Sequence, residues 1–164
     1  MAYLLDANVF IAAKNTCYGF DFCPAFWDWL VREAASGTVL SVEKVGDELQ
    51  GHGDALAEWA TKRGQHFFLP PQPDALPQLA AVARWVQTQA YSPAGVTAFL
   101  QGADYYLVAQ AKAGNHVVVT NEKPEQSIHR VKIPSVCIGL GIKCVSPYQM
   151  LRVEHARFVL EPRP

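Results

Sequence analysis

The chain opens with Ala2-Tyr3-Leu4-Leu5-Asp6-Ala7-Asn8, and this stretch decides how the rest is interpreted. Its apolar first half predicts a short buried strand, and the following Val9–Ala13 predicts a helix begun by an acidic or amide side chain. Asp6 and Asn8 therefore lie in a polar turn just beyond a strand. A nucleotide-binding sheet would carry a glycine-rich G-x-G-x-x-G or G-x-x-x-x-G-K-S/T loop here, so the sequence argues against a nucleotide cofactor.

Short apolar segments alternate with amphipathic helical segments along the rest of the chain. Runs that are apolar throughout are typical of parallel strands covered by helices on both faces. The sequence therefore predicts one α/β domain over residues 1–151, an α/β/α sandwich with a central parallel sheet, followed by a C-terminal tail over 152–164. The expected strands are 38–41, 67–69 and 117–119, with a last apolar segment at 135–138, and the expected helices are 25–35, 42–49, 54–63, 75–90, 94–99, one from Asp104 and one from Ser146.

The composition is that of a globular protein with an uneven distribution of charge. The 164 residues are 50% hydrophobic and 18% charged, which is enough to bury a core, and the net charge is -1. This balance lacks the basic excess of a protein that holds duplex DNA by charge alone. Residues 120–164, however, contain 7 basic and 4 acidic side chains, a net charge of +3. We expect any phosphate-attracting surface to come mostly from this C-terminal third.

Neither a targeting segment nor a metal-binding cysteine motif is recognisable. The longest stretch without charge, 85–103, is too polar to span a bilayer, and Asp6 interrupts the apolar N-terminus too early for a secretory signal. We therefore expect a cytoplasmic protein with no membrane partner. Cys17, Cys23, Cys137 and Cys144 form no C-x-x-C pair, which favours reduced structural thiols over a zinc site or disulfides.

Four acidic side chains fall where the predicted fold would gather them. Asp6 follows the first strand and Glu122 follows the strand at Val117–Val119, and the carboxyl ends of parallel strands border one crevice. Asp104 begins the helix that precedes the latter strand and runs antiparallel to it, which places its first turn at the same edge. Glu48 lies about two helical turns beyond the second strand and reaches the crevice only if its helix leans over it.

Carboxylates gathered in this way repel one another unless a cation neutralises them. Oxygen ligands without histidine or cysteine favour Mg²⁺ or Mn²⁺, and the chemistry that most often uses such a cluster is phosphodiester hydrolysis. Three of the acids also have an ordinary interpretation: Asp6 and Asp104 as helix caps, and Glu48 as a solvated helix residue. The small polar residues Asn8, Thr120 and Asn121 at the same edge fit turn chemistry as well as support of the ligands.

Four segments of the chain resemble the PIN-domain nucleases and, more closely, a PIN-like family of bacterial and archaeal proteins. The segments are Tyr3–Asn8, Ser41–Leu49, Ala103–Ala109 and Val118–Glu122, and their order and spacing fit from Met1 to about Leu151. The resemblance implies that Asp6, Glu48, Asp104 and Glu122 bind one or two Mg²⁺ or Mn²⁺ ions and are catalytic, with Asn8, Thr120 and Asn121 in support.

The resemblance also implies an activity and partners. The implied reaction is hydrolysis of RNA that leaves a 5′-phosphate and a 3′-hydroxyl. Many small relatives are VapC-like toxins of toxin–antitoxin systems, silenced by a cognate antitoxin protein. Two features depart from that pattern: the last acid is Glu122 where Asp is usual, and the helical region over 54–101 is long. A catalytically weak module that binds RNA or a protein, and a nuclease that cuts DNA, are the alternative hypotheses.

Two further groups of side chains have candidate roles toward RNA. Lys123, Arg130 and Lys132 follow Glu122 closely and could hold phosphates, although a solvated surface explains them too. An aromatic stretch is expected to pack in the core or in a homodimer, with stacking on single-stranded RNA as the alternative. It comprises Tyr18, Phe20, Phe22, Phe26, Trp27 and Trp29.

Overall fold

The sheet at the centre of the fold is parallel throughout, as the sequence predicts, in a computed structural model that describes residues 1–160. Its strands lie in the order β3 (Phe68–Leu69), β2 (Val39–Val42), β1 (Tyr3–Leu5), β4 (Val117–Val119) and β5 (Cys144–Val145). The side chains of Leu4, Leu5, Val118 and Val119 are fully buried, because helices cover both faces of the sheet. This explains why β1 and β4 carry no charged or alternating polar residues.

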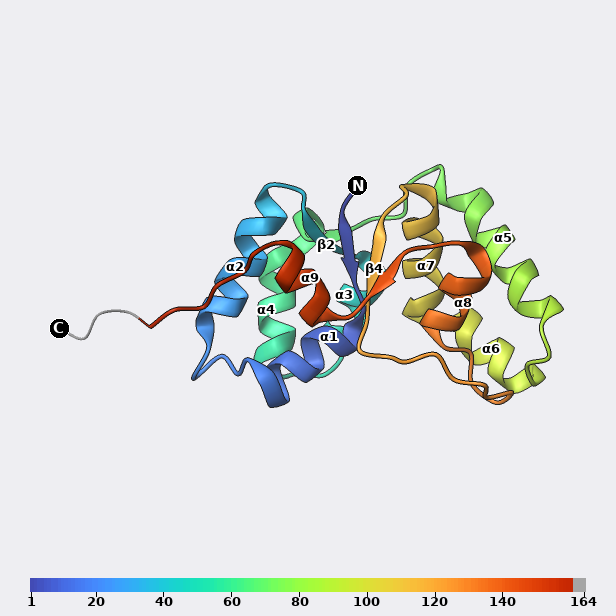
Figure 1. The fold of residues 1–164 in the computed structure, drawn as a ribbon, viewed down its shortest axis with the longest axis horizontal. Coiled ribbons are helices and arrows are strands. Elements are labelled where there is room, and N and C mark those ends of the chain that lie inside the picture. The colour runs from blue at the N-terminus through green and yellow to red at the C-terminus, as the bar shows by residue number, and fades with distance from the viewer. Residues whose placement is uncertain (161–164) are drawn as a thin grey trace.

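Helices flank the sheet on both sides, which confirms the α/β sandwich. In Figure 1, α1, α2, α4 and α9 lie on one side of the strands and α5, α6, α7 and α8 on the other. Two short irregular turns, a π-helix at Ala13–Cys17 and a 3-10 helix at Gly64–His66, follow α1 and α4. The helices are α1 (Ala7–Ala12), α2 (Pro24–Ala35), α3 (Glu43–Gln50), α4 (Ala55–Arg63), α5 (Ala75–Thr88), α6 (Pro93–Gln101), α7 (Ala103–Ala113), α8 (Ile133–Leu140) and α9 (Pro147–Val153).

The apolar segment at 135–138 forms part of a helix, and the fifth strand comes later. Pro134 occupies the first turn of α8, where its missing N–H costs nothing, and the helix ends at Gly141 with φ of +68°. The chain then enters β5 directly. Ser146 caps α9 with a reciprocal hydrogen-bond pair to Gln149, which confirms the predicted helix start.

Most of the aromatic stretch packs in the core. Phe26, Trp27 and Trp29 on α2 are buried, and the ring of Tyr18 stacks on Phe26 at 4.4 Å between centroids. Phe158 of the C-terminal tail packs edge-on against the ring of Tyr18, so this part of the tail returns to the domain. Phe20 stacks on Trp27, whereas Phe22 is 65% exposed. The predicted tail beyond residue 160 lies outside the described residues.

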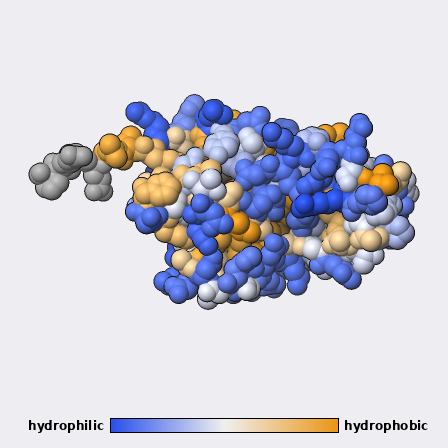
Figure 2. Space-filling view, turned by 90° about the horizontal axis from the view of Figure 1, so that it is seen from below, coloured by the Kyte–Doolittle hydropathy of each residue, from blue (hydrophilic) through white to orange (hydrophobic). Residues whose placement is uncertain are grey.

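The chain reverses its direction of travel across the sheet between β1 and β4. After β1 it builds outward through β2 and β3, and then crosses back to add β4 and β5 on the other side of β1. In a parallel sheet the crevice beyond such a reversal is where ligands bind. This edge faces downward in Figure 1, and Figure 2, seen from below, shows mainly hydrophilic side chains over its centre.

Within residues 1–160, no helix combines the length and apolar character that crossing a bilayer requires.

Candidate active site

Asp6 lies at the carboxyl end of β1 with only 4% of its surface exposed. Its position is the N-cap of α1, yet its side chain caps nothing and instead accepts a hydrogen bond of 2.7 Å from the Thr120 hydroxyl. Asp6 therefore occupies the predicted cap position without a side-chain cap bond. Burial is the main cause that raises the pKa of Asp6 to about 7, and the negative charge of Asp104 adds to the increase.

A small polar network holds the Asp6 carboxylate in place. The Thr120 hydroxyl, which donates to Asp6, accepts bonds from the Asn8 side-chain amide at 3.1 Å and from the Glu122 backbone N–H at 3.0 Å. The Asn121 backbone N–H donates in turn to Asn8 Oδ1 at 3.0 Å. Asn8, Thr120 and Asn121 thus join the ends of β1 and β4 and position Asp6, as supporting groups would.

Replacing Thr120 with valine is expected to destabilise the protein by about 2 kcal/mol at pH 8, because a buried hydrogen bond to a charged group is lost while the shape is kept. The loss should be smaller at pH 4.5, where Asp6 is protonated. Urea unfolding of Thr120→Val at both pH values measures the effect, and Thr120→Ser, which retains the hydroxyl, is the matched control. Equal stability of parent and Thr120→Val at pH 8 would show that the bond contributes nothing.

Asp104 is the second residue of α7, where Gly102 and not Asp104 holds the N-cap position. Burial, followed by the negative charges of Glu122 and Glu48, raises the pKa of Asp104 to about 6. The positive charges of Arg130 and Lys132 act in the opposite direction. The charge of Glu122 raises the pKa of both Asp6 and Asp104, and the charge of Asp104 raises the pKa of Asp6. The two carboxylates therefore occupy one electrostatic environment.

Glu122 lies in the same electrostatic environment, but both oxygens of its carboxylate accept hydrogen bonds from other groups of the chain. One oxygen accepts bonds from Lys132 Nζ at 3.3 Å and from Arg130 at 3.4 Å, and the other accepts from the Ile133 backbone N–H at 2.9 Å. Its charge still acts on Asp6 and Asp104. The predicted phosphate-binding residues Arg130 and Lys132 therefore stand beside the carboxylates and pair with one of them.

The remaining predicted site residues, Glu48 and Lys123, are exposed residues near the carboxylates. Glu48 on α3 is exposed and its charge acts on Asp104, so α3 does bring it within electrostatic range of the site. Lys123 is exposed and lines a pocket of about 420 Å³ together with Glu122. Two further acids close in sequence to Glu48 have other partners: Asp54 caps α4 and pairs with Lys14, and Asp47 pairs with Lys44 at 3.6 Å.

The loop between β4 and α8 is positioned by two groups that the sequence patterns did not identify. The Ser92 backbone N–H donates to the Ile128 carbonyl at 2.7 Å, and a Cβ on Gly95 would lie only 2.8 Å from the His129 carbonyl oxygen. Glycine therefore lets α6 approach this loop closely. The Ser92-Pro93 helix start carried no signal for this role, because the partner atoms are backbone carbonyls more than 30 residues away.

The fit of these residues to a divalent cation is partial. Asp6 and Asp104 offer carboxylate oxygens whose ionised forms repel one another, which is the environment that Mg²⁺ or Mn²⁺ relieves. Glu122 is engaged by Lys132, and among residues 1–160 no three His, Cys, Asp or Glu side chains are grouped as a metal centre. Asp6 and Asp104 are thus the residues that would hold the ion, and the ligand roles of Glu48 and Glu122 stay predictions.

Comparison with known proteins places the chain in a family. The sequence profile of a family described as a domain of unknown function (DUF4411) matches residues 3–158. The chain belongs to this family. A search of curated proteins and a search of solved structures each gave no match. Because the DUF4411 match spans both strand ends that carry Asp6 and Glu122, the candidate site lies wholly within the family domain.

Proposed function

We propose that this DUF4411 protein is a Mg²⁺- or Mn²⁺-dependent ribonuclease that hydrolyses RNA phosphodiester bonds. The observation that carries the proposal is the buried carboxylate of Asp6 with the charge of the half-buried Asp104 acting on it, at the edge where β1 and β4 end. Such a pair is costly in an apo protein and useful to one that binds a cation. The resemblance of the four segments to PIN-domain nucleases supports the same reaction.

Each side chain has a stated task in this proposal. Asp6, fixed by Thr120, and Asp104 would hold the cation, and Glu48 would approach from α3. A bound divalent ion supplies charge neutralisation at the scissile phosphate and lowers the pKa of the attacking water. Lys132 and Arg130 stand beside the carboxylates, where they would orient the phosphate backbone of the substrate and exchange Glu122 for phosphate oxygens.

A second candidate function rests on Glu122. Because both of its oxygens accept bonds from the chain's own donors, the site has one free acid fewer than the resemblance implies. A catalytically weak module that binds RNA or a protein partner would not require a complete set of free acids. We prefer the nuclease because an RNA-binding module has no use for the neighbouring negative charges of Asp6 and Asp104, which repel phosphate.

The decisive experiment is digestion of labelled single-stranded RNA and of a DNA oligomer of matched sequence, with MnCl₂, MgCl₂ or EDTA. We expect cleavage of the RNA with either metal and none with EDTA. Preference for the DNA would assign the protein to the DNA-directed nucleases. Binding of RNA without cleavage in either metal would favour the weak module.

The biological setting follows from the same proposal. By its resemblance to VapC-like proteins, the enzyme would act as the toxin of a toxin–antitoxin system, with a cognate antitoxin protein and a homodimer as its assemblies. Induced expression of the parent should then arrest growth in a bacterial host. Expression of Asp104→Asn at the same level should not, because the variant loses one of the two carboxylates that would hold the ion. Equal growth in both cultures would argue against the toxin role.

A further inference from the structure

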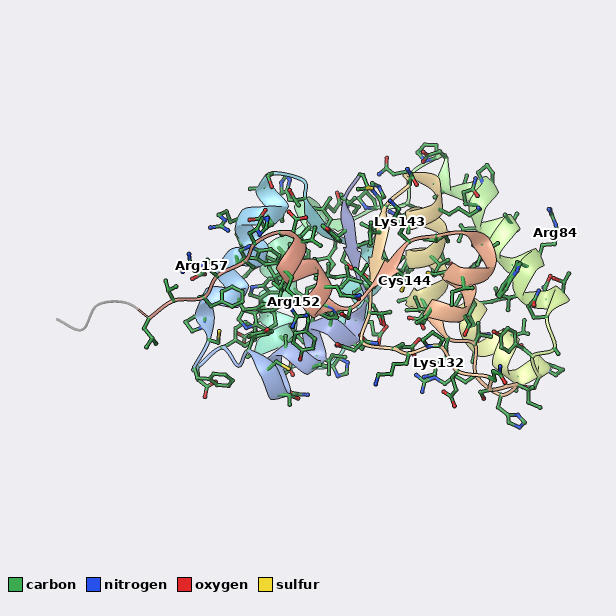
Figure 3. All side chains as sticks on the ribbon, in the orientation of Figure 1. Arg84, Lys132, Lys143, Cys144, Arg152 and Arg157 are labelled. Carbon is green, nitrogen blue, oxygen red and sulfur yellow. The ribbon has the colours of Figure 1, made fainter. Side chains whose placement is uncertain are left out.

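A second hollow lies beside α9, away from the carboxylates. It has a volume of about 370 Å³ and is lined by three aromatic residues, Tyr18, Tyr148 and Phe158, and by three basic ones, Arg152, His155 and Arg157, with no acidic residue in its lining. Figure 3 shows Arg152 on α9 and Arg157 on the segment that follows it, at the end of the molecule opposite Arg84. Aromatic surface combined with positive charge and no carboxylate favours a ligand with an anionic group and a flat apolar ring.

The cations of this hollow are free to bind a ligand. Among residues 1–160, neither Arg152 nor Arg157 forms an ion pair, and both are exposed. Their situation differs from that of Arg130 and Lys132, which pair with Glu122. The acid nearest in sequence, Glu154, lies close to Tyr3, whose pKa it helps to raise. Both arginines belong to the C-terminal third, for which the distribution of charge in the sequence predicts a phosphate-attracting surface.

Tyr148 connects this hollow with the candidate active site. Its ring lines the 370 Å³ hollow and also the 420 Å³ pocket that contains Thr120, Asn121 and Glu122. Tyr148 is 46% exposed, so part of its ring faces solvent between the two. A polymer that crosses the carboxylate edge at Glu122 therefore meets Tyr148 next and then the arginines.

We propose that the hollow formed by Tyr18, Tyr148, Phe158, Arg152, His155 and Arg157 binds a nucleotide of single-stranded RNA next to the cleavage site. The inference rests on the proposed ribonuclease function, because that function requires a phosphodiester chain at Glu122 and the hollow is its continuation. A base stacks on the exposed ring of Tyr148, and Arg152 and Arg157 hold the adjoining phosphates. Stacking accepts any base, so this site contributes affinity with little sequence preference.

The test is fluorescence anisotropy of a fluorescein-labelled 16-nucleotide single-stranded RNA of mixed sequence, titrated with the full chain in EDTA at several salt concentrations. We expect Arg152→Gln with Arg157→Gln to weaken binding about tenfold and to reduce the salt slope by about 1.4, roughly 0.7 for each phosphate contact on a single strand. Tyr148→Leu should weaken binding about tenfold, and Tyr148→Phe should restore it. Arg84→Gln, an exposed arginine at the far end, is the matched control and should change affinity less than twofold.

Affinity and salt slope that stay at the parent values in both the arginine and the Tyr148→Leu variants would overturn the inference. So would a parent that does not bind the RNA, or arginine variants that keep RNA binding while losing a synthetic acidic peptide, which would assign the hollow to a protein partner. Cleavage with Mn²⁺ is scored separately. A parent that binds RNA through Arg152 and Arg157 without cutting it would support this site and refute the ribonuclease proposal.

Discussion

Replacing Asp6 with asparagine is expected to lower metal-dependent RNA cleavage roughly 10²–10³-fold, the range seen when one preorganised electrostatic group is removed from an active site. Asparagine keeps the size of the side chain and an oxygen that can accept the Thr120 hydroxyl bond of 2.7 Å. The change therefore removes the charge that would bind the cation and little else. Initial cleavage rates of a labelled single-stranded RNA at saturating MnCl₂ measure it, with circular dichroism to confirm the fold.

Asp47→Asn is the matched control for this change. Asp47 is an exposed acid on α3 that pairs with Lys44, next in sequence to Glu48, so its loss should leave the rate within about twofold of the parent, as surface changes away from a site usually do. Asp104→Asn should resemble Asp6→Asn, because the two carboxylates act on each other. Parent-like cleavage by both Asp6→Asn and Asp104→Asn would remove the basis of the nuclease proposal.

The location of Asp6 could be predicted from sequence because only local rules are needed. An apolar strand followed at once by a polar residue puts that residue at the carboxyl end of the sheet, whatever the remaining topology. The location of Asp104 could be predicted in the same way, because α7 runs antiparallel to the strand that follows it. What local rules could not separate was a capping carboxylate from a free one. That distinction depends on Thr120, which lies 114 residues from Asp6 and donates its hydroxyl to the carboxylate.

The hydrogen-bond partners of Glu122 could not be predicted from the sequence. Its distance from the end of β4 predicted the correct edge of the sheet, but its partners come from a loop without regular structure. Lys132 and the Ile133 N–H reach Glu122 because the loop turns back toward α8 and is held at Ile128 by Ser92. No periodicity encodes such a path. The apolar segment 135–138 was ambiguous for a related reason, since a short buried helix and a buried strand are equally apolar.

Stability of the metal-free protein is expected to fall as the pH rises from about 4 to about 7. Burial and the charge of Asp104 raise the pKa of folded Asp6 to about 7, whereas the unfolded chain keeps the ordinary value of 3.8. The folded state therefore binds more protons than the unfolded state between these values, and its stability decreases with pH there. The stabilising contribution is complete below pH 4 and is lost once the pH passes the folded pKa.

Asp6→Asn isolates this contribution, because asparagine resembles the protonated acid at every pH. At pH 8 and without metal, the variant should be more stable than the parent by about 2–4 kcal/mol, the order expected for a shift of this size. At pH 4.5 the difference should shrink to about 1 kcal/mol, because the unfolded chain is already partly ionised there. Urea unfolding in EDTA at both pH values gives the comparison. A parent as stable as Asp6→Asn at pH 8 would mean that Asp6 is not strained by its surroundings, and the argument for a cation would fail with it.

Mn²⁺ should restore the stability that the metal-free protein loses when Asp6 ionises. A cation binds the ionised carboxylates and competes with protons, so MnCl₂ should raise the melting temperature of the parent more at pH 8 than at pH 5.5. At 100 times its dissociation constant the ion adds about 2.7 kcal/mol, which corresponds to roughly 5–10 °C for a chain of this length. Asp6→Asn should lose most of that increase, and Asp47→Asn should keep it. An equal Mn²⁺ effect in all three proteins would place the ion elsewhere, because only a site that includes Asp6 couples metal, proton and stability through one carboxylate.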